Sequence, residues 1–390
     1  MNGKQHLRKM VFFALAGALA FGLSTPAVQA AAPAVSVVSQ ANLPATAVTS
    51  NAIKVMPINQ AKFWQGQRFD FEVELPLTTT EVAVTINGED ATKVFKQDAT
   101  ITQYADHISY RINDVSFKDT GDKRVNVVAN TAQGAIRKMA NYKVVNEKAQ
   151  KKAKNVILFV GDGMSMQAKE VARILSKGMS DGKFNDVLAM EKMPHMALIT
   201  TSGYDSIVTD SANSASAYNT GNKSVVNAMG VYENSTPDPM DDPKVENISE
   251  IISRAKDMSY GMVTTAAVTD ATPAAVTAHT RRRGEQNFIA MDFLNRKNPP
   301  AVVLGGGSQF FLPLETPGSK RKDNVNVIQE FKNKGYQFAG NKTELAQTTA
   351  DKPILGLFTL NTMNVYMDRE FLPEIHPCLK VSTTNLVFWI

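Results

Sequence analysis

Three short segments of this 390-residue sequence carry side chains whose types and spacing suit chemistry on an anion. In the first segment, Asp162 stands between two glycines directly after an apolar run, which exposes its carboxylate and lets a ligand approach the backbone. A hard divalent cation prefers such carboxylate oxygens. An equally simple interpretation makes Asp162 the N-cap of a following helix. Taken alone, this segment leaves both roles open.

The second segment, residues 208–217, reads Val-Thr-Asp-Ser-Ala-Asn-Ser-Ala-Ser-Ala. Its small residues favour a closely packed helix whose amino end presents Ser211, where backbone amides and the positive helix end attract an anion. A serine hydroxyl is a poor nucleophile at neutral pH and needs a base or a metal. Because no histidine lies nearby in the sequence, a metal is the better candidate. The alternative is that Ser211 only caps a tightly packed helix.

The third segment, residues 269–283, combines oxygen ligands with a guanidinium. Asp270 and Thr272 supply two oxygens just before a predicted helix with a proline in its first turn. Arg283 follows about three helical turns later and is placed to reach an anion, because a guanidinium binds phosphate through two parallel hydrogen bonds. The alternative is that the arginines at 281–283 form a solvated helix end.

The elements that must position these residues follow an α/β pattern. Apolar strands alternate with helical segments, which predicts a mostly parallel sheet with helices on both faces. The predicted strands are 156–160, 262–268, 301–304 and 354–358, and the predicted helices are 165–175, 248–258 and 325–331. Ligands of such sheets bind outside the carboxyl ends of the strands. Asp162 and Asp270 both stand at such ends.

Residues 31–146 follow a different pattern. Around Phe69 to Leu75 apolar and polar residues alternate, and the turn pair Asn87-Gly88 follows another alternating run. Short alternating strands broken by turns predict a small immunoglobulin-like β-sandwich. We expect it to brace the neighbouring domain, and the alternative is that it binds a partner. A polar linker at 147–154 joins the two parts.

Residues 1–30 read as a secretory signal: basic residues, an apolar run at Met10–Leu23, and small residues before the cleavage site. The apolar run is shorter than the ~20 residues of a membrane-spanning helix. The sequence therefore predicts a periplasmic or secreted protein without a stable membrane anchor. Removing Lys4, Arg8 and Lys9 lowers the formal charge from +5 to +2. We accordingly expect no binding to nucleic acid.

The composition is that of an ordinary soluble protein, with 43% hydrophobic and 20% charged residues, which excludes a disordered or coiled-coil chain. A single cysteine, Cys378, excludes an internal disulfide framework and a cysteine-based zinc site. The Gly-x-Ser-x-Gly motif of serine esterases is absent. His279 is expected to be packed or hydrogen-bonded rather than a metal ligand.

Three segments follow one another along the chain: Val-Gly-Asp-Gly-Met at 160–164, Thr-Asp-Ser-Ala at 209–212, and Asp-Ala-Thr-Pro at 270–273, with Arg283 ten residues after the proline. In this order they resemble the alkaline phosphatase family. The resemblance covers about residues 154–369. It implies the family's α/β fold and the hydrolysis of small phosphate monoesters through a phosphoserine.

The resemblance also implies a role for each site residue. Ser211 resembles the nucleophile that becomes the phosphoserine and faces a zinc ion, and Arg283 resembles the phosphate clamp. Asp162 resembles the carboxylate that bridges one zinc and the magnesium, while Asp270 and Thr272 resemble magnesium-site positions. Zn²⁺ and Mg²⁺ are therefore the implied cofactors. Because family members are commonly dimers, the resemblance implies a homodimer for a complete chain.

Two departures from the family pattern change these expectations. Asn213 stands where the family has a very small residue. After residue 369 the family continues with acidic and histidine ligands, including a Glu-Gly-Gly segment, and residues 370–390 contain nothing similar. We therefore expect a partial phosphatase domain at 155–369, an aberrant tail at 370–390, and weak or absent activity. The alternative function is a non-catalytic binding or scaffold protein that uses the β domain.

Overall fold

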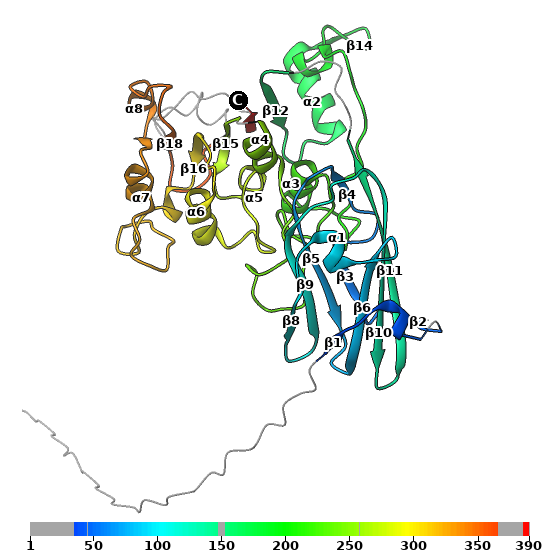
Figure 1. Ribbon diagram of the computed structural model, residues 1–390. Coiled ribbons are helices and arrows are strands. Elements are labelled where there is room, and N and C mark those ends of the chain that lie inside the picture. The colour runs from blue at the N-terminus through cyan, green and yellow to red at the C-terminus, as the bar shows by residue number, and fades with distance from the viewer. Residues whose placement is uncertain (1–34, 45, 147–152, 257, 366–384, 390) are drawn as a thin grey trace, which may run out of the picture. The chain divides into compact units, whose positions relative to one another are not determined.

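The computed structural model describes residues 35–44, 46–146, 153–256, 258–365 and 385–389 (Figure 1). The predicted secretory signal and most of the predicted linker lie outside the described residues. In the part of the chain that is described, no helix is long and apolar enough to cross a membrane.

Residues 35–146 form two β-sheets that share one apolar core. The larger sheet has the order β1-β6-β10-β11-β2, with β7 beside β6 and β4 beside β11; its strands are β1 Ser36–Val37, β2 Val48–Thr49, β4 Lys62–Trp64, β6 Thr79–Ile86, β7 Glu89–Asp90, β10 Gly121–Thr131 and β11 Gly134–Val145. The smaller, antiparallel sheet has the order β3-β5-β9-β8; its strands are β3 Lys54–Met56, β5 Phe69–Leu75, β8 Thr100–Gln103 and β9 Ile108–Val115. A 3₁₀ helix at Gln40–Asn42 and helix α1 at Ala91–Phe95 complete this part.

The alternating pattern explains the core of this sandwich. Phe69, Phe71 and Val73 of β5 are fully buried, and the ring of Phe69 stacks on that of Phe63 with centroids 4.5 Å apart. Alternate residues of a strand point to the same face, so one face of β5 is apolar. A two-sheet sandwich is therefore observed, while its immunoglobulin-like type stays a prediction.

The polar face of β5 is also buried, which the alternating pattern did not indicate. The segment 235–246 of the α/β part covers it. Ser235 donates its backbone N–H (2.5 Å) and its hydroxyl (2.6 Å) to the carboxylate of Glu74. Phe69 and Val245 form an antiparallel bridge. The buried carboxylate is tolerated because these donors satisfy its oxygens.

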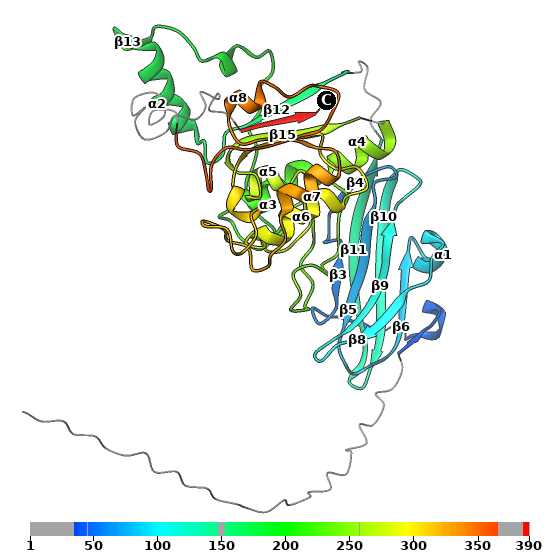
Figure 2. The same ribbon diagram turned by 90° about the vertical axis from the view of Figure 1, so that its left-hand side faces the viewer.

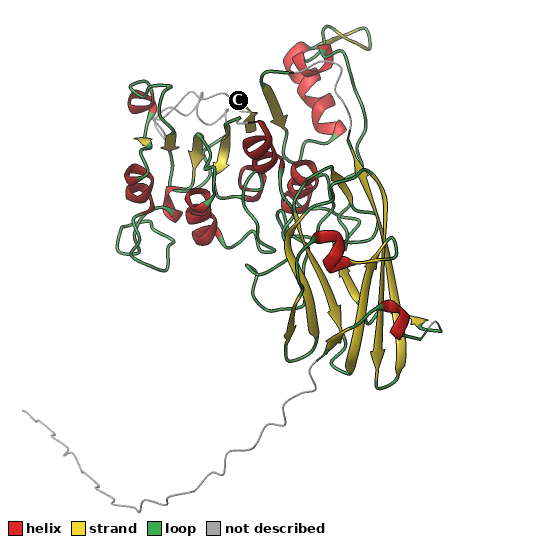
Figure 3. Ribbon diagram, viewed as in Figure 1, coloured by secondary structure: helices red, strands yellow, loops and turns green. Residues whose placement is uncertain are grey.

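The α/β part contains a mixed sheet (Figure 3) of order β12-β19-β15-β16-β18-β17. Its strands are β12 Val156–Val160, β15 Tyr260–Ala267, β16 Val302–Gly306, β17 Gln337–Ala339, β18 Ile354–Leu357 and β19 Asn385–Trp389, and a separate hairpin joins β13 Met179–Ser180 to β14 Lys183–Phe184. The pairs β15–β16, β16–β18 and β17–β18 are parallel, as expected, whereas β19 runs antiparallel to both β12 and β15.

The segment predicted to be an aberrant tail therefore contributes one strand to this sheet. Only residues 385–389 of that segment are described, and the rest of 370–390, including Cys378, lies outside the described residues. That the tail is foreign to the fold stays a prediction.

The α/β part contains these helices: α2 Met166–Lys177, α3 Ser211–Thr220, α4 Ile248–Lys256, α5 Ala271–Ala274, α6 Gln286–Asn295, α7 Val327–Asn333 and α8 Lys342–Leu345, with 3₁₀ helices at Ala189–Lys192 and Ser308–Phe310. In Figure 2, α3, α5, α6 and α7 gather on one side of the sheet, where a second apolar core joins helices to strands. By contrast, α2 keeps apolar side chains in solvent, and Leu175 is 81% exposed. Helical cover of the sheet's second face stays a prediction.

Candidate functional site

Ser211 is the first residue of α3, but it does not cap that helix. The N-cap is Asp210, whose Oδ1 accepts a hydrogen bond from the backbone N–H of Asn213 (3.0 Å), while the Asn213 side chain accepts one from the Asp210 N–H (3.2 Å). This reciprocal capping leaves the half-buried hydroxyl of Ser211 available at the amino end of the helix. The alternative in which Ser211 only caps the helix is therefore wrong.

Arg283 lies directly against this serine. Its Nη1 donates to Ser211 Oγ (2.8 Å) and to Asp210 Oδ2 (3.2 Å), and its Nη2 donates to Asp270 Oδ1 (2.6 Å). Partial burial by itself lowers the pKa of Arg283, but the hydrogen bonds and charges of the two carboxylates outweigh burial and raise it. The guanidinium is thus a fixed positive charge at the amino end of α3.

Asp162 and Thr272 form a second contact of the site. The hydroxyl of Thr272 donates to Asp162 Oδ2 over 2.7 Å. Asp162 is not the N-cap of α2, because Ser165 fills that position and accepts from the backbone N–H of Ala168 (3.1 Å). The carboxylate of Asp162 is therefore bound by Thr272 of α5 rather than by the amino end of α2.

These side chains come from positions at or next to the ends of different strands and helices. Asp162 follows β12, Ser211 opens α3, and Asp270 lies after β15 as the N-cap of α5. The helix predicted after Asp270 is wrong in length, because α5 ends at Ala274. The chain then turns back, and the backbone N–H of Arg283 is bound by the carbonyl of Asn227 (3.0 Å).

The interpretation of Arg281 to Arg283 as a solvated helix end is also wrong. Arg281 is buried and donates to the carbonyls of Asn234 (3.1 Å) and Thr236, close to the buried carboxylate of Asp242. Burial raises the pKa of Asp242 to about 6, although an Asn234 N–H and the Arg281 charge oppose this. The contacts of Arg281 therefore fix the loop that carries Arg283.

The sequence profile of the alkaline phosphatase family matches residues 153–387, which is more than half of the chain. The chain belongs to the alkaline phosphatase family. It is 32% identical over 237 residues to an alkaline phosphatase of Schizosaccharomyces pombe, covering 58% of this chain and 42% of that protein. It is 33% identical over 242 residues to alkaline phosphatase H of Pseudomonas aeruginosa, covering 56% of this chain and 48% of that protein.

Among solved structures, the Thermus thermophilus alkaline phosphatase is 27% identical, with a TM-score of 0.45 over 55% of this chain and 42% of that one. The matched region thus spans less than half the length of these alkaline phosphatases.

The donor atoms present suit only part of the metal set that the family resemblance implies. The Asp162 carboxylate and the Thr272 hydroxyl are hard oxygen donors of the kind that Mg²⁺ takes. Zinc sites rely on histidine nitrogen or cysteine sulfur in addition to carboxylates. Among the described residues, no group of three or more His, Cys, Asp or Glu is placed to hold a metal ion. The described part of this chain therefore does not fit two zinc ions.

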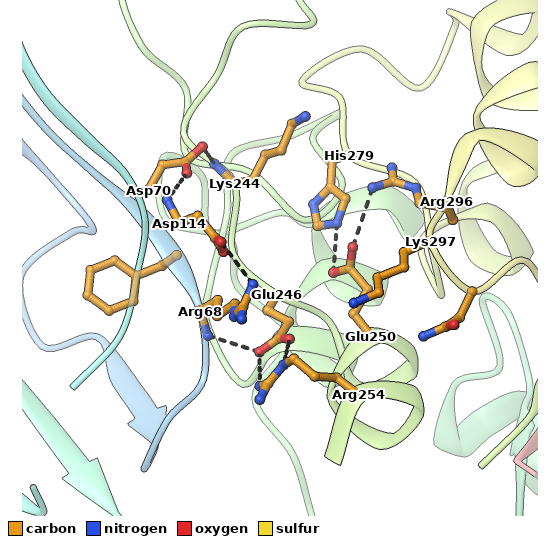
Figure 4. A pocket seen from close by; sticks show the side chains of 12 residues that line it. Arg68, Asp70, Asp114, Lys244, Glu246, Glu250, Arg254, His279, Arg296 and Lys297 are labelled. Carbon is orange, nitrogen blue, oxygen red and sulfur yellow. Dashed lines mark hydrogen bonds and ion pairs between the residues drawn. The ribbon is translucent and has the colours of Figure 1, made fainter. Parts of the chain in front are cut away.

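His279 is held in a separate network, as expected for a hydrogen-bonded histidine. Its Nδ1 lies 2.7 Å from the carbonyl oxygen of Gly230 and its Nε2 lies 3.0 Å from Glu250 Oε2. The network borders a cavity of ≈ 290 Å³ between the β-sandwich and the α/β part (Figure 4). Glu250 there also pairs with Arg296 (3.4 Å), and Arg254 pairs with Glu246 (2.7 Å). Both ion pairs lie within the α/β part, and the sandwich joins them through the backbone N–H of Arg68, which donates to Glu246 Oε2 (2.9 Å).

The sequence analysis missed Asp210. The signal was present, because an acidic residue directly before Ser211 is placed both to cap α3 and to bind the arginine. The contact between Asn227 and Arg283 had no such signal, since it depends on the path of the intervening loop.

Proposed function

We propose that this chain binds the phosphate group of small phosphate monoesters between Arg283 and the amino end of α3, with Ser211 as the nucleophile of a phosphoserine intermediate. The hydrogen bond from Arg283 Nη1 to Ser211 Oγ carries this proposal. It places a guanidinium and a hydroxyl at the amino end of a helix, which is a favourable arrangement for an anion. Membership of the alkaline phosphatase family supports the phosphate monoester as the substrate class.

In the proposed reaction, the Ser211 oxygen forms a bond to phosphorus while the ester oxygen departs with the bonding electron pair. The serine proton goes to solvent, and the departing oxygen takes a proton from solvent. Arg283 offsets the charge on the non-bridging oxygens, and the α3 amides orient them. Water then hydrolyses the phosphoserine, which restores the hydroxyl and releases phosphate.

We further propose that hydrolysis by this chain is weak or absent. Among the described residues, Ser211 has a hydrogen bond to Arg283 but none to a general base. Nor do the described residues place three or more His, Cys, Asp or Glu side chains together to hold a zinc ion. Zn²⁺ and Mg²⁺ remain the cofactors that the family resemblance implies, and secretion and a homodimer remain predictions. We expect no turnover of p-nitrophenyl phosphate above background with both metals added, and robust Ser211-dependent turnover would contradict this.

Phosphate binding is the direct test of the proposed site. We expect calorimetry to show binding of inorganic phosphate by the wild type and at least tenfold weaker binding by Arg283→Ala. Arg283→Lys should recover only part of the affinity, because an ammonium cannot form two parallel hydrogen bonds. Arg282→Ala is the matched control, since Arg282 is exposed beside the site, and its affinity should stay within twofold. Equal phosphate affinity of the wild type and Arg283→Ala would refute the proposal.

A further inference from the structure

The outer face of the larger β-sheet carries a hollow of ≈ 860 Å³ whose described lining includes none of the phosphate-site residues. Of its described lining residues, Lys62, Arg124, Arg137 and Lys143 are basic and only Asp122 is acidic. Over the whole chain the charges are nearly balanced, with 42 basic and 37 acidic residues. The hollow is therefore a local concentration of positive charge.

Strand pairing places these side chains in rows on one face of the sheet. Lys143 of β11 is paired with Lys62 of β4 on one side and with Asp122 of β10 on the other. One row further along, Arg124 of β10 is opposite Asn141 of β11. All five side chains are exposed, while their sequence neighbours Phe63, Val125, Tyr142 and Val144 are buried in the apolar core. The rows cross β10 and β11, which lie side by side in Figure 1.

Folding does not explain this charge. Within the described residues, no hydrogen bond or ion pair reaches the side-chain nitrogens of Lys62, Lys143 or Arg124. Two lysines opposite each other on neighbouring strands repel one another. It is the backbone of Lys62, not its ammonium group, that binds the side chain of Asn222 (3.0 and 2.9 Å). Among the described residues, the charges of Lys62, Lys143 and Arg124 are therefore free to bind an anionic ligand.

The remaining lining residues indicate which anionic ligand fits. Amide side chains, those of Gln60, Asn126 and Asn141 among them, lie between the cations and offer donors and acceptors to hydroxyl groups. Single-stranded nucleic acid binds largely by stacking its bases on exposed aromatic rings. In the described lining the one aromatic residue, Tyr142, is buried. Sugars with carboxylate groups match this surface better than bases do.

We propose that this hollow binds an acidic polysaccharide with carboxylates on its sugar rings. The carboxylates pair with Lys62, Lys143 and Arg124, and the sugar hydroxyls bond to the amides of Asn126 and Asn141. The site is independent of the phosphate site, so either proposal can fail without the other.

The test measures binding of the full chain to polygalacturonate at low salt, with neutral dextran as the uncharged polymer. We expect the wild type to bind polygalacturonate and not dextran. Lys62→Glu/Lys143→Glu should bind at least tenfold more weakly. Lys322→Glu/Lys342→Glu makes the same charge change at exposed positions of the α/β part and should stay within twofold of the wild type. Arg124→Gln, a milder change, should weaken binding severalfold and covers the case in which the double variant does not fold.

A second pair of measurements separates a sugar site from a general polyanion site. Asn126→Ala/Asn141→Ala keeps every charge and should weaken polygalacturonate binding severalfold. Single-stranded DNA of matched charge should bind the wild type more weakly than polygalacturonate. The proposal is overturned if Lys62→Glu/Lys143→Glu or the amide variant binds like the wild type. Equal losses in the Lys322/Lys342 control, or DNA or dextran binding equal to that of polygalacturonate, would overturn it as well.

Discussion

At the scale of single residues, the guanidinium of Arg283 is shared between two carboxylates and one hydroxyl. Asp210 and Asp270 both accept hydrogen bonds from it, the latter over 2.6 Å. An incoming phosphate must compete with these carboxylates for the same N–H groups, because a guanidinium has a fixed set of donors. The carboxylates therefore orient Arg283 and also limit its affinity for phosphate.

Asp270→Asn tests this competition. Asparagine is as good an N-cap as aspartate, so α5 should keep its start. Removing the negative charge should raise the affinity for inorganic phosphate severalfold, as measured by calorimetry at pH 8. Asp119→Asn makes the same charge change at an exposed position of the β-sandwich and should leave the affinity unchanged. Weaker phosphate binding by Asp270→Asn would mean that orientation by the carboxylate outweighs competition.

Glu250 gives a residue-scale prediction about stability and pH. Burial by itself raises its pKa, but the charge and hydrogen bond of His279, the charge of Arg296 and a backbone N–H outweigh burial and lower the pKa from 4.5 to about 2. A carboxyl with a depressed pKa stabilises the fold above its unfolded pKa, and this contribution is lost as the pH falls from about 4.5 to about 2. A shift of this size corresponds to roughly 3 kcal/mol.

We therefore expect Glu250→Gln to lower the free energy of unfolding by about 2–3 kcal/mol at pH 7. The difference from the wild type should shrink steadily below pH 4.5. Urea unfolding at pH 7 and pH 3 measures both values. Glu89→Gln, at an exposed position in β7, is the control and should match the wild type at both pH values. A difference that is the same at pH 7 and pH 3 would contradict the charge argument.

The residues that the sequence could identify are those that lie in short continuous motifs. Asp162, Ser211, Asp270, Thr272 and Arg283 were all found in this way, and the structure brings them into two contacting groups. Their chemical roles stay predictions. The basic hollow could not be found, because β4 lies far in the sequence from the β10–β11 hairpin and only the sheet register places Lys62 beside Lys143.

At the scale of elements, β16 shows how closely the sheet and its loops are packed. A Cβ added to Gly306, the last residue of β16, would meet the carbonyl oxygen of Asn361 and, at 2.6 Å, the hydroxyl of Thr359. Cβ atoms essentially never come within 3.0 Å of another heavy atom, so the backbone would have to move. The same loop is bound to the amide of Gly307, which leaves little freedom for such a movement.

Gly306→Ala is therefore expected to destabilise the protein by about 3 kcal/mol or more, since overpacking against backbone relaxes poorly. Gly284→Ala is the matched control, because an added Cβ there meets no atom within 4 Å. Its unfolding free energy should stay within about 0.5 kcal/mol of the wild type. Thermal unfolding followed by circular dichroism compares the two. A Gly306→Ala protein as stable as Gly284→Ala would mean that the Asn361 loop is not fixed.

Elements whose residues have a clear apolar period were predictable, and those decided by tertiary contacts were not. The strands β12, β15, β16 and β18 follow continuous apolar runs and were found close to their observed bounds. The helix after Asp270 was predicted too long because its small residues suit a helix, although Arg281 is drawn instead to the carbonyls of the 234–236 loop. The burial of the polar face of β5 depends on a segment about 170 residues away, which no local pattern reports.

At the scale of the whole described molecule, the β-sandwich binds the α/β part at the carboxyl end of α3. The buried side chain of Gln67 donates to the carbonyls of Thr220 (3.0 Å) and Glu246 (2.9 Å), and Asn222 bonds the backbone of Lys62 in both directions. Ser211 is at the amino end of α3, so these contacts fix the opposite, carboxyl end of the helix that carries it. The sequence favoured a bracing role for the β-sandwich, and the contacts of Gln67 and Asn222 allow that role to be tested.

Gln67→Ala removes the two hydrogen bonds to Thr220 and Glu246 together with the one its Oε1 accepts from the Trp64 N–H (3.0 Å). The Thr220 carbonyl keeps a donor, Asn222 Nδ2 (3.1 Å), so the main loss is at the Glu246 carbonyl, and the free energy of unfolding should fall by about 1–3 kcal/mol. If the sandwich braces α3, hydrogen exchange should rise in α3 as well as in β4 and β5, because the two parts then open together. Gln347→Ala, at an exposed position after α8, should change neither quantity. Faster exchange confined to the sandwich, with α3 as protected as in the wild type, would show that the domain does not brace the helix.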